Sequence, residues 1–209
     1  MKNIIGSNVT LTLFGESHGT AVGAVIDGLA PGIEVDEDFI RSQLDLRRPV
    51  GKISTPRSEQ DKFNILSGVF EGKTTGTPIC IVIPNEDTKS KDYGEMKFKM
   101  RPGHADFTAN EKYHGFADYR GGGHFSGRIT AAIVAAGAII ISALSKKGIY
   151  IGTHILKCAM VKDREFVDIS DDIKLLSKKE FAVLDDSIAE EMKARILAAR
   201  SVGDSVGGV

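Results

Sequence analysis

Polar and apolar residues alternate along residues 8–14, and Val9, Leu11 and Leu13 fall on one face of this segment. A period of two is typical of a half-buried strand, so this segment is predicted to be one. Alternating or β-branched runs predict three further strands, at residues 20–26, 63–70 and 77–83. The turn-rich segment 71–76 is predicted to join the last two strands.

A helix is predicted to begin after Asp36, which can cap its first turn, while Val35 and Ile40 are spaced as a hydrophobic staple. Ile40 and Leu44 fall on one apolar face of this helix. Pro49 is expected to end it, because proline disfavours helical geometry in the residue that precedes it.

The longest apolar stretch, Ile129–Leu144, has 16 residues. That is shorter than the ~20 residues needed to span a bilayer, so a buried helix is expected. Farther along the chain, strands are predicted at residues 149–156 and 157–169, and a surface helix at residues 186–201. In the surface helix, Glu191 is placed to pair with Arg195 one turn later.

These strands and helices are mixed without a regular βαβ alternation, which favours the α+β class over a doubly wound sheet. Neither a repeat nor a flexible linker stands out, so residues 1–209 are expected to belong to one domain. The N-terminus lacks the apolar core of a signal peptide, and a soluble, cytoplasmic protein is expected. Cys80 and Cys158 are expected to be reduced, buried thiols without metal-ligand spacing, and no bound metal is expected.

The formal net charge of −1 gives no global basic field, so neither nucleic acid nor a membrane is an expected partner. Any anionic ligand must then be held by cations that cluster locally. The arginine pair Arg47-Arg48, followed by Lys52 and Arg57, could grip a phosphate or carboxylate. The spacing alone favours a plainer interpretation, in which the pair complements the dipole at a helix C-terminus. The lysine-rich segment 85–103 is expected to be a solvated loop.

The pentapeptide Gly15-Glu16-Ser17-His18-Gly19 follows the first long strand and fits the G-x-S-x-G pattern of serine hydrolases. A nucleophile elbow needs a helix after the serine, and the β-branched residues 20–26 make a poor one. By itself the pentapeptide could therefore be a nucleophile site or simply a tight glycine turn with a surface histidine.

His104 follows a Pro-Gly turn between Arg101 and Asp106, where it could act as a general acid or be an ordinary loop histidine. The glycine triplet Gly121–Gly123 precedes the long apolar helix, and Ser126 can cap that helix. Glycines in this position can offer backbone N–H groups to an anion. Their spacing is that of neither a dinucleotide fingerprint nor a Walker A loop.

These motifs occur together and in one order: the pentapeptide, the arginine pair, Ser67–Ile79, the Arg101–Asp106 hexapeptide and Asp118–Arg128. The series resembles the chorismate synthase family along nearly all of residues 8–140 and again at residues 202–209. The resemblance implies the β-α-β sandwich-type layers of the chorismate synthase fold, here incomplete. It also implies that residues 1–209 form the N-terminal part of a single domain whose C-terminal half is absent.

The family converts 5-enolpyruvylshikimate 3-phosphate to chorismate in a 1,4-elimination that releases phosphate and one ring proton, and it requires reduced FMN. The resemblance implies the same substrate and cofactor here, and a homotetramer for the full-length protein. By resemblance, His18 would protonate the leaving phosphate and His104 would lie against the flavin. Substrate contacts would come from Ser17, Arg48, Arg101 and Arg128, and flavin contacts from Ser126, Gly127 and Arg128.

Two departures from the family pattern matter. Many members have an arginine after the glycine triplet, whereas this chain has His124-Phe125. The family also has a C-terminal half that carries the rest of the flavin pocket, so the 209-residue chain is predicted to be catalytically incomplete. The alternatives are a non-catalytic anion- or flavin-binding module, an inactive paralogue and, more distantly, a serine esterase.

Overall fold

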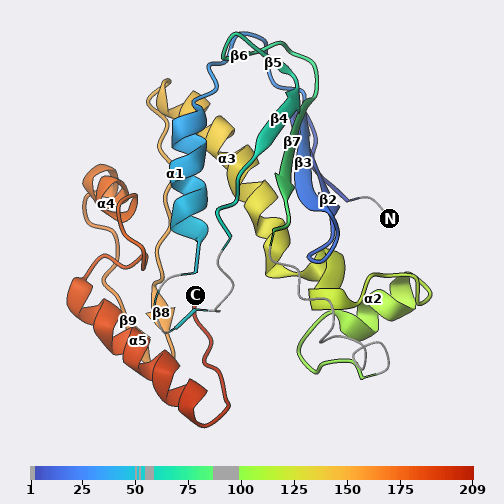
Figure 1. Ribbon diagram of the computed structural model, residues 1–209. Coiled ribbons are helices and arrows are strands. Elements are labelled where there is room, and N and C mark those ends of the chain that lie inside the picture. The colour runs from blue at the N-terminus through green and yellow to red at the C-terminus, as the bar shows by residue number, and fades with distance from the viewer. Residues whose placement is uncertain (1–2, 50, 52, 55–58, 87–98) are drawn as a thin grey trace. The chain divides into compact units, whose positions relative to one another are not determined.

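The computed structural model describes residues 3–49, 51, 53–54, 59–86 and 99–209 (Figure 1). The chain forms two compact units, one built from residues 3–48 and 59–143 and the other mainly from residues 144–209. Both units could be parts of one domain, so the expectation of a single domain stays a prediction. Lys52 and Arg57 lie outside the described residues, as do Lys89, Lys91 and Lys97 of the lysine-rich segment 85–103.

The first unit is built on a five-stranded antiparallel sheet with the strand order β1-β2-β3-β7-β4. Its strands are β1 (Ile4–Gly6), β2 (Thr10–Gly15), β3 (Ala21–Asp27), β4 (Asn64–Ser67) and β7 (Ile79–Pro84). Alternate apolar residues of β3 and β7, such as Val22 and Ile81, are completely buried. The period-two pattern thus creates the face on which the core is built.

Helices α1 (Glu37–Arg47) and α3 (Thr130–Ser145) cover that face of the sheet (Figure 1). Asp36 caps α1 as predicted, because its carboxylate accepts a hydrogen bond from the Phe39 N–H at 2.9 Å. By length and composition, residues 127–145 could also cross a membrane. However, α3 is buried through Ala131, Ala132, Ala135, Ala136 and Ala138 in one cluster with the sheet residues, as expected for a core helix.

Two short elements lie at opposite ends of the sheet in Figure 1, a hairpin and a helix. Strands β5 (Val69–Phe70) and β6 (Lys73–Thr74) form the hairpin, and α2 (Asp106–Lys112) is the helix. Gly68, with φ of +80°, interrupts the predicted strand 63–70, which is therefore two strands. The sequence pattern did not predict α2, because only Ala109 of its seven residues is buried.

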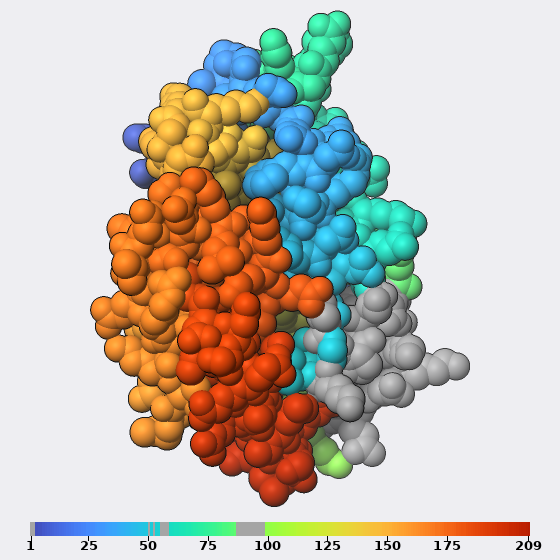
Figure 2. Space-filling model, turned by 90° about the vertical axis from the view of Figure 1, so that its left-hand side faces the viewer, coloured from blue at the N-terminus to red at the C-terminus, as the bar shows by residue number. Residues whose placement is uncertain are grey.

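The second unit contains β8 (Lys157–Cys158), β9 (Val161–Lys162), α4 (Ile169–Leu176) and α5 (Asp186–Ser201). In Figure 2 residues 150–209, coloured orange to red, form a continuous surface. The predicted α5 is confirmed, and its Glu191 lies 3.6 Å from Arg195. The strand prediction for 149–156 is wrong, and 157–169 contains only two short strands. The helix α4, capped by Asp168, was not predicted.

The antiparallel sheet with helices packed on it confirms the α+β class. Neither cysteine forms a disulfide. Cys158 is buried as expected, whereas Cys80 is only half-buried, so that part of the prediction is wrong.

Candidate active site

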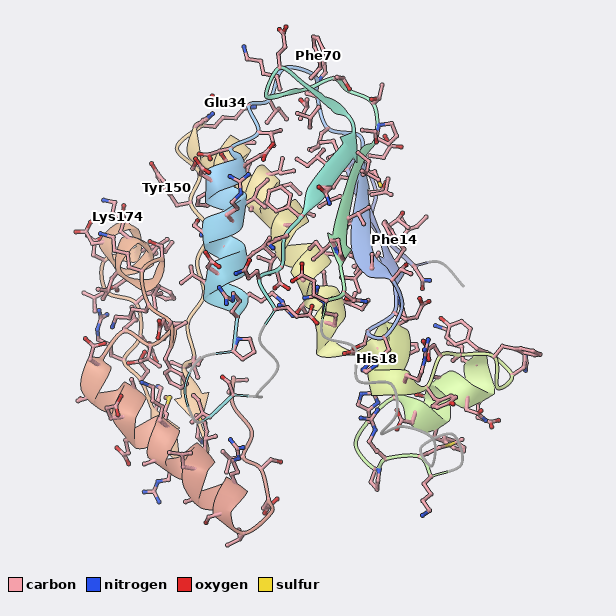
Figure 3. All side chains as sticks on the ribbon, viewed as in Figure 1. Phe14, His18, Glu34, Phe70, Tyr150 and Lys174 are labelled. Carbon is pink, nitrogen blue, oxygen red and sulfur yellow. The ribbon has the colours of Figure 1, made fainter. Side chains whose placement is uncertain are left out.

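The pentapeptide Gly15–Gly19 forms the tight connection between the antiparallel strands β2 and β3. A strand rather than a helix follows it, so the nucleophile-elbow interpretation is wrong for this chain. The surface-histidine interpretation is wrong as well, since Ser17 is 1% and His18 is 9% exposed. Figure 3 shows His18 at the end of the sheet that lies toward α2.

The glycine triplet packs directly against this connection. The Ser17 N–H donates a hydrogen bond to the Gly123 carbonyl at 3.0 Å. A Cβ atom on Gly121 would lie 2.4 Å from His18 Cδ2 and 3.1 Å from Ser17 Oγ. Gly121 also has φ of +57°, a conformation that side chains rarely adopt. Glycine is therefore required here for two reasons, the backbone conformation and the contact with His18.

The next glycine packs against the second predicted histidine. A Cβ atom on Gly122 would lie 2.7 Å from His104 Cε1. His104 Nδ1 is 2.6 Å from Asp106 Oδ1, and the Arg101 guanidinium donates two hydrogen bonds to the same carboxylate at 2.8 and 2.9 Å. The hydrogen bonds from Arg101, although opposed by burial, hold the pKa of Asp106 well below its ordinary value. The carboxylate therefore stays ionised beside the His104 ring.

A second carboxylate lies near His18. Asp118 accepts hydrogen bonds from Arg120 at 2.8 and 2.9 Å, and these lower the pKa of Asp118 against the opposing effect of burial. Positive charge on His18 contributes further to the lowered pKa of Asp118. The Asp118 carboxylate therefore stays ionised near His18.

The arginines predicted to bind substrate have different surroundings. The side chain of Arg48 is 35% exposed and contacts only the exposed Asp45 among the ion pairs described, at 3.2 Å. Arg101 is 34% exposed. By contrast, the Arg128 side chain is 3% exposed and is bound to the carboxylates of Glu59 and Asp61. Arg48 and Arg101 are thus partly open to a solvent-borne anion, although Arg101 is bound to Asp106, whereas Arg128 is buried with its two carboxylate partners.

The residues predicted to contact the flavin begin the helical segment before α3. Ser126 Oγ accepts a hydrogen bond from the Arg128 N–H at 3.3 Å, so its predicted capping role is confirmed for the short helix η3 (Gly127–Ile129). The Gly127 carbonyl accepts a hydrogen bond from the Thr130 hydroxyl at 2.5 Å. Flavin contacts at these positions stay a prediction.

His124, which replaces the arginine of many family members, links two of the motifs. Its Nδ1 lies 2.9 Å from the carbonyl oxygen of Gly15, at the start of the pentapeptide. A carbonyl can only accept, so Nδ1 carries the proton in this hydrogen bond. The exchange therefore places a short hydrogen-bonding side chain directly after the glycine triplet, whose backbone is not helical.

A cavity of about 670 Å³ opens beside this cluster and reaches Gly122, Asp106 and His124. Much of its wall is apolar or aromatic, including Leu13, Phe14, Met100, Tyr113 and Phe125. This size and lining are typical of a small-molecule site. The apolar dimethylbenzene part of a flavin ring fits such a wall, whereas the wall offers carboxylates rather than Lys or Arg side chains to the FMN phosphate.

Two residues that contact the motifs, Asn85 and Asp61, were not predicted as site residues from the sequence. The sequence pattern predicts only a polar loop from Asn85 onward, whereas the structure places Asn85 directly after β7. Among the described residues, no group of three or more histidine, cysteine or acidic side chains could hold a metal ion.

A buried histidine and a second histidine held on one glycine triplet, with solvent-accessible arginines in the same unit, define a site suited to proton transfer on an anionic ligand. The sequence profile of the chorismate synthase family matches residues 9–209. The chain belongs to the chorismate synthase family.

Similar proteins named chorismate synthase occur in Aliarcobacter butzleri, at 48% identity over 208 residues, and in Aeropyrum pernix, at 44% over 209 residues. These alignments cover 99% and 100% of this chain but 56% and 55% of the relatives. A crystal structure of chorismate synthase is similar with a TM-score of 0.67 and 27% identity, over 97% of this chain and 56% of that one. The chain thus spans about half the length of the curated relatives it matches.

Proposed function

We propose that this chain provides one wall of a site that eliminates phosphate from 5-enolpyruvylshikimate 3-phosphate to give chorismate, in the shikimate pathway of aromatic amino acid biosynthesis. In this 1,4-elimination the bond between a ring carbon and the phosphate oxygen breaks, a ring proton is lost, and a new double bond forms. Membership of the chorismate synthase family supports the proposal.

The strongest support for the proposal is that both histidines pack against the same glycine triplet. His18 and His104, 86 positions apart by number, contact the neighbouring residues Gly121 and Gly122. Two proton-transfer groups are thus held by the same rigid turn. His18, beside the ionised Asp118, is the proposed acid that protonates the leaving phosphate. His104, held by Asp106, is proposed to lie against the flavin and to adjust its protonation.

We propose Arg48 and Arg101 as the cations that receive the phosphate and carboxylates, because their guanidinium groups are partly exposed. Ser17, next to His18, is proposed to contribute a hydroxyl to the same site. Because the whole chain is close to neutral, such a local cluster is needed to hold an anion with several charges.

Reduced FMN, when bound, would supply electron density to the breaking C–O bond. The wall of the neighbouring cavity, with Phe125 and Tyr113, would face its ring system. The apolar side chains of that wall would exclude water from the ring, and Asp106 would position His104. The cations for the FMN phosphate would have to come from elsewhere in the full-length protein.

The proposal is tested by calorimetric titration of the chain with 5-enolpyruvylshikimate 3-phosphate. Arg48→Ala should weaken binding about tenfold or more, because a charge-assisted hydrogen bond is lost. Arg41→Ala is the matched control on the same helix, since Arg41 pairs only with the exposed Glu37 and Asp38 among the ion pairs described. Equal affinity of the Arg48→Ala variant and the unsubstituted chain would contradict the proposed role.

We also propose that the 209-residue chain alone does not turn over, because it spans about half the length of its relatives. An assay with reduced FMN and the enolpyruvyl substrate should detect no chorismate above the background rate. Near-normal turnover would show that this incompleteness proposal is wrong. A homotetramer and a cytoplasmic location of the full-length protein likewise remain proposals based on the family.

A further inference from the structure

A polar network connects the end of α1 to the pentapeptide, and two of its residues, Asp61 and Asn85, lie outside the sequence motifs. Asp61 accepts hydrogen bonds from both Arg47, at 2.6 Å, and Arg128. Arg128 also contacts Glu59 at 2.8 Å. The two arginines and two carboxylates balance in charge, so Arg128 has little net attraction left for a ligand anion.

Arg128, held by these carboxylates, also forms a hydrogen bond with the side-chain amide of Asn85. Its Nε donates a hydrogen bond to Asn85 Oδ1 at 2.9 Å, and its Nη2 donates another to the neighbouring Pro84 carbonyl at 3.1 Å. A guanidinium fixed on several sides is a rigid donor. Arg128 therefore fixes the orientation of the Asn85 amide, whose oxygen points toward the guanidinium and whose nitrogen points away from it.

The other end of the Asn85 amide holds the pentapeptide. Asn85 Nδ2 donates to the carbonyl of Glu16 at 2.9 Å and to that of Gly19 at 2.8 Å. The Asn85 N–H donates to the Thr20 carbonyl at 3.0 Å. Both amide hydrogens therefore bind the backbone on either side of Ser17 and His18.

From this geometry we infer that Asn85 is a positioning residue for the His18 imidazole. The two hydrogen bonds of its amide hold the backbone before and after His18, at Glu16 and Gly19. Arg128, Asp61 and Arg47 act on the site through Asn85. That His18 performs chemistry rests on the proposed function, whereas its positioning can be tested in the ligand-free chain. The readout is the ¹⁵N and ¹H signals of the His18 imidazole, which report its hydrogen bonding and tautomer.

Asn85→Asp separates positioning from general stability. An aspartate keeps an acceptor for Arg128 but replaces the amide donor with an oxygen that faces two carbonyl groups. We expect the His18 signals to shift and broaden in this variant, while those of His154 in the second unit stay unchanged. Asn85→Ala should change the His18 signals in the same way. Asn64→Ala, an exposed asparagine on the neighbouring strand β4, should leave both histidines unchanged.

Unchanged His18 signals in a folded Asn85→Asp chain would overturn the inference. Loss of folding in that variant would also overturn it, because the amide would then hold the whole unit rather than one turn. Neither result depends on substrate. A failure here is thus distinguishable from a failure of the proposed function, which the binding titration measures.

Discussion

At the scale of single residues, the site depends on glycines whose neighbours leave no room for a side chain. Gly121 and Gly122 combine positive φ angles with contacts to His18 and His104. The spacing of the motifs could not reveal these contacts, because they join residues far apart in the sequence. The residue types of the site could be predicted from the sequence, because histidines that lie next to glycine turns and near arginines are typical of a site that binds anions and transfers protons.

Replacement of Gly121 by alanine should be costly. The added Cβ would lie 2.4 Å from His18, and the backbone has φ of +57°. We expect the variant to lose about 2 kcal/mol or more of unfolding free energy, measured by urea titration, because both strain and overpacking destabilise.

Gly137 in the middle of α3 provides the control. A Cβ atom there would meet no atom within 4 Å outside the local helix backbone, so Gly137→Ala should gain up to about 1 kcal/mol from helix propensity. If Gly121→Ala proved as stable as the unsubstituted chain, the tight packing of the triplet on His18 would be disproved.

At the scale of elements, the sequence pattern predicted strands and helices well wherever buried residues recur at a regular spacing. Strands β2 and β3 and helices α1 and α5 follow such patterns, and all four were found. Helix α2 has one buried residue, so it gave no periodic signal. The apolar segment 149–156 resembles a strand in composition, but the structure shows no strand there. A pattern within one segment cannot show whether a pairing partner exists.

The second unit contains carboxylates with lowered pKa values, which should make its stability depend on pH. The Arg164 side chain lowers the pKa of Asp172 from 3.8 to about 2 through hydrogen bonds. Burial works against ionisation of Asp163, but hydrogen bonds from the Leu184 N–H and His154 outweigh it and lower the pKa of Asp163.

A carboxylate with a lowered pKa stabilises the folded state above its unfolded pKa, and this contribution disappears as the pH falls through the folded pKa. The midpoint of thermal unfolding of the second unit should therefore fall as the pH decreases from about 4 toward about 2. His154 signals can follow this transition. Asp172→Asn should make the decrease less steep, whereas Asp171→Asn, which removes an exposed ion pair with Lys174, should not. An equally steep decrease in Asp172→Asn would contradict the assignment.

At the scale of the whole molecule, the order of motifs indicated the family, although each motif alone was ambiguous. The family match over residues 9–209 agrees with that interpretation. The pentapeptide shows why joint occurrence matters, because its pattern alone suggested a serine nucleophile. In the folded chain it is a strand-to-strand connection that holds a buried histidine.

We propose that His18 and His104 belong to one site that binds the enolpyruvyl phosphate substrate. The most direct test is to add 5-enolpyruvylshikimate 3-phosphate to the ¹⁵N-histidine-labelled chain and to follow its five imidazoles. We expect saturable shifts of the His18 and His104 signals, with no change at His154 in the second unit. Saturable binding that leaves both His18 and His104 unchanged would contradict it.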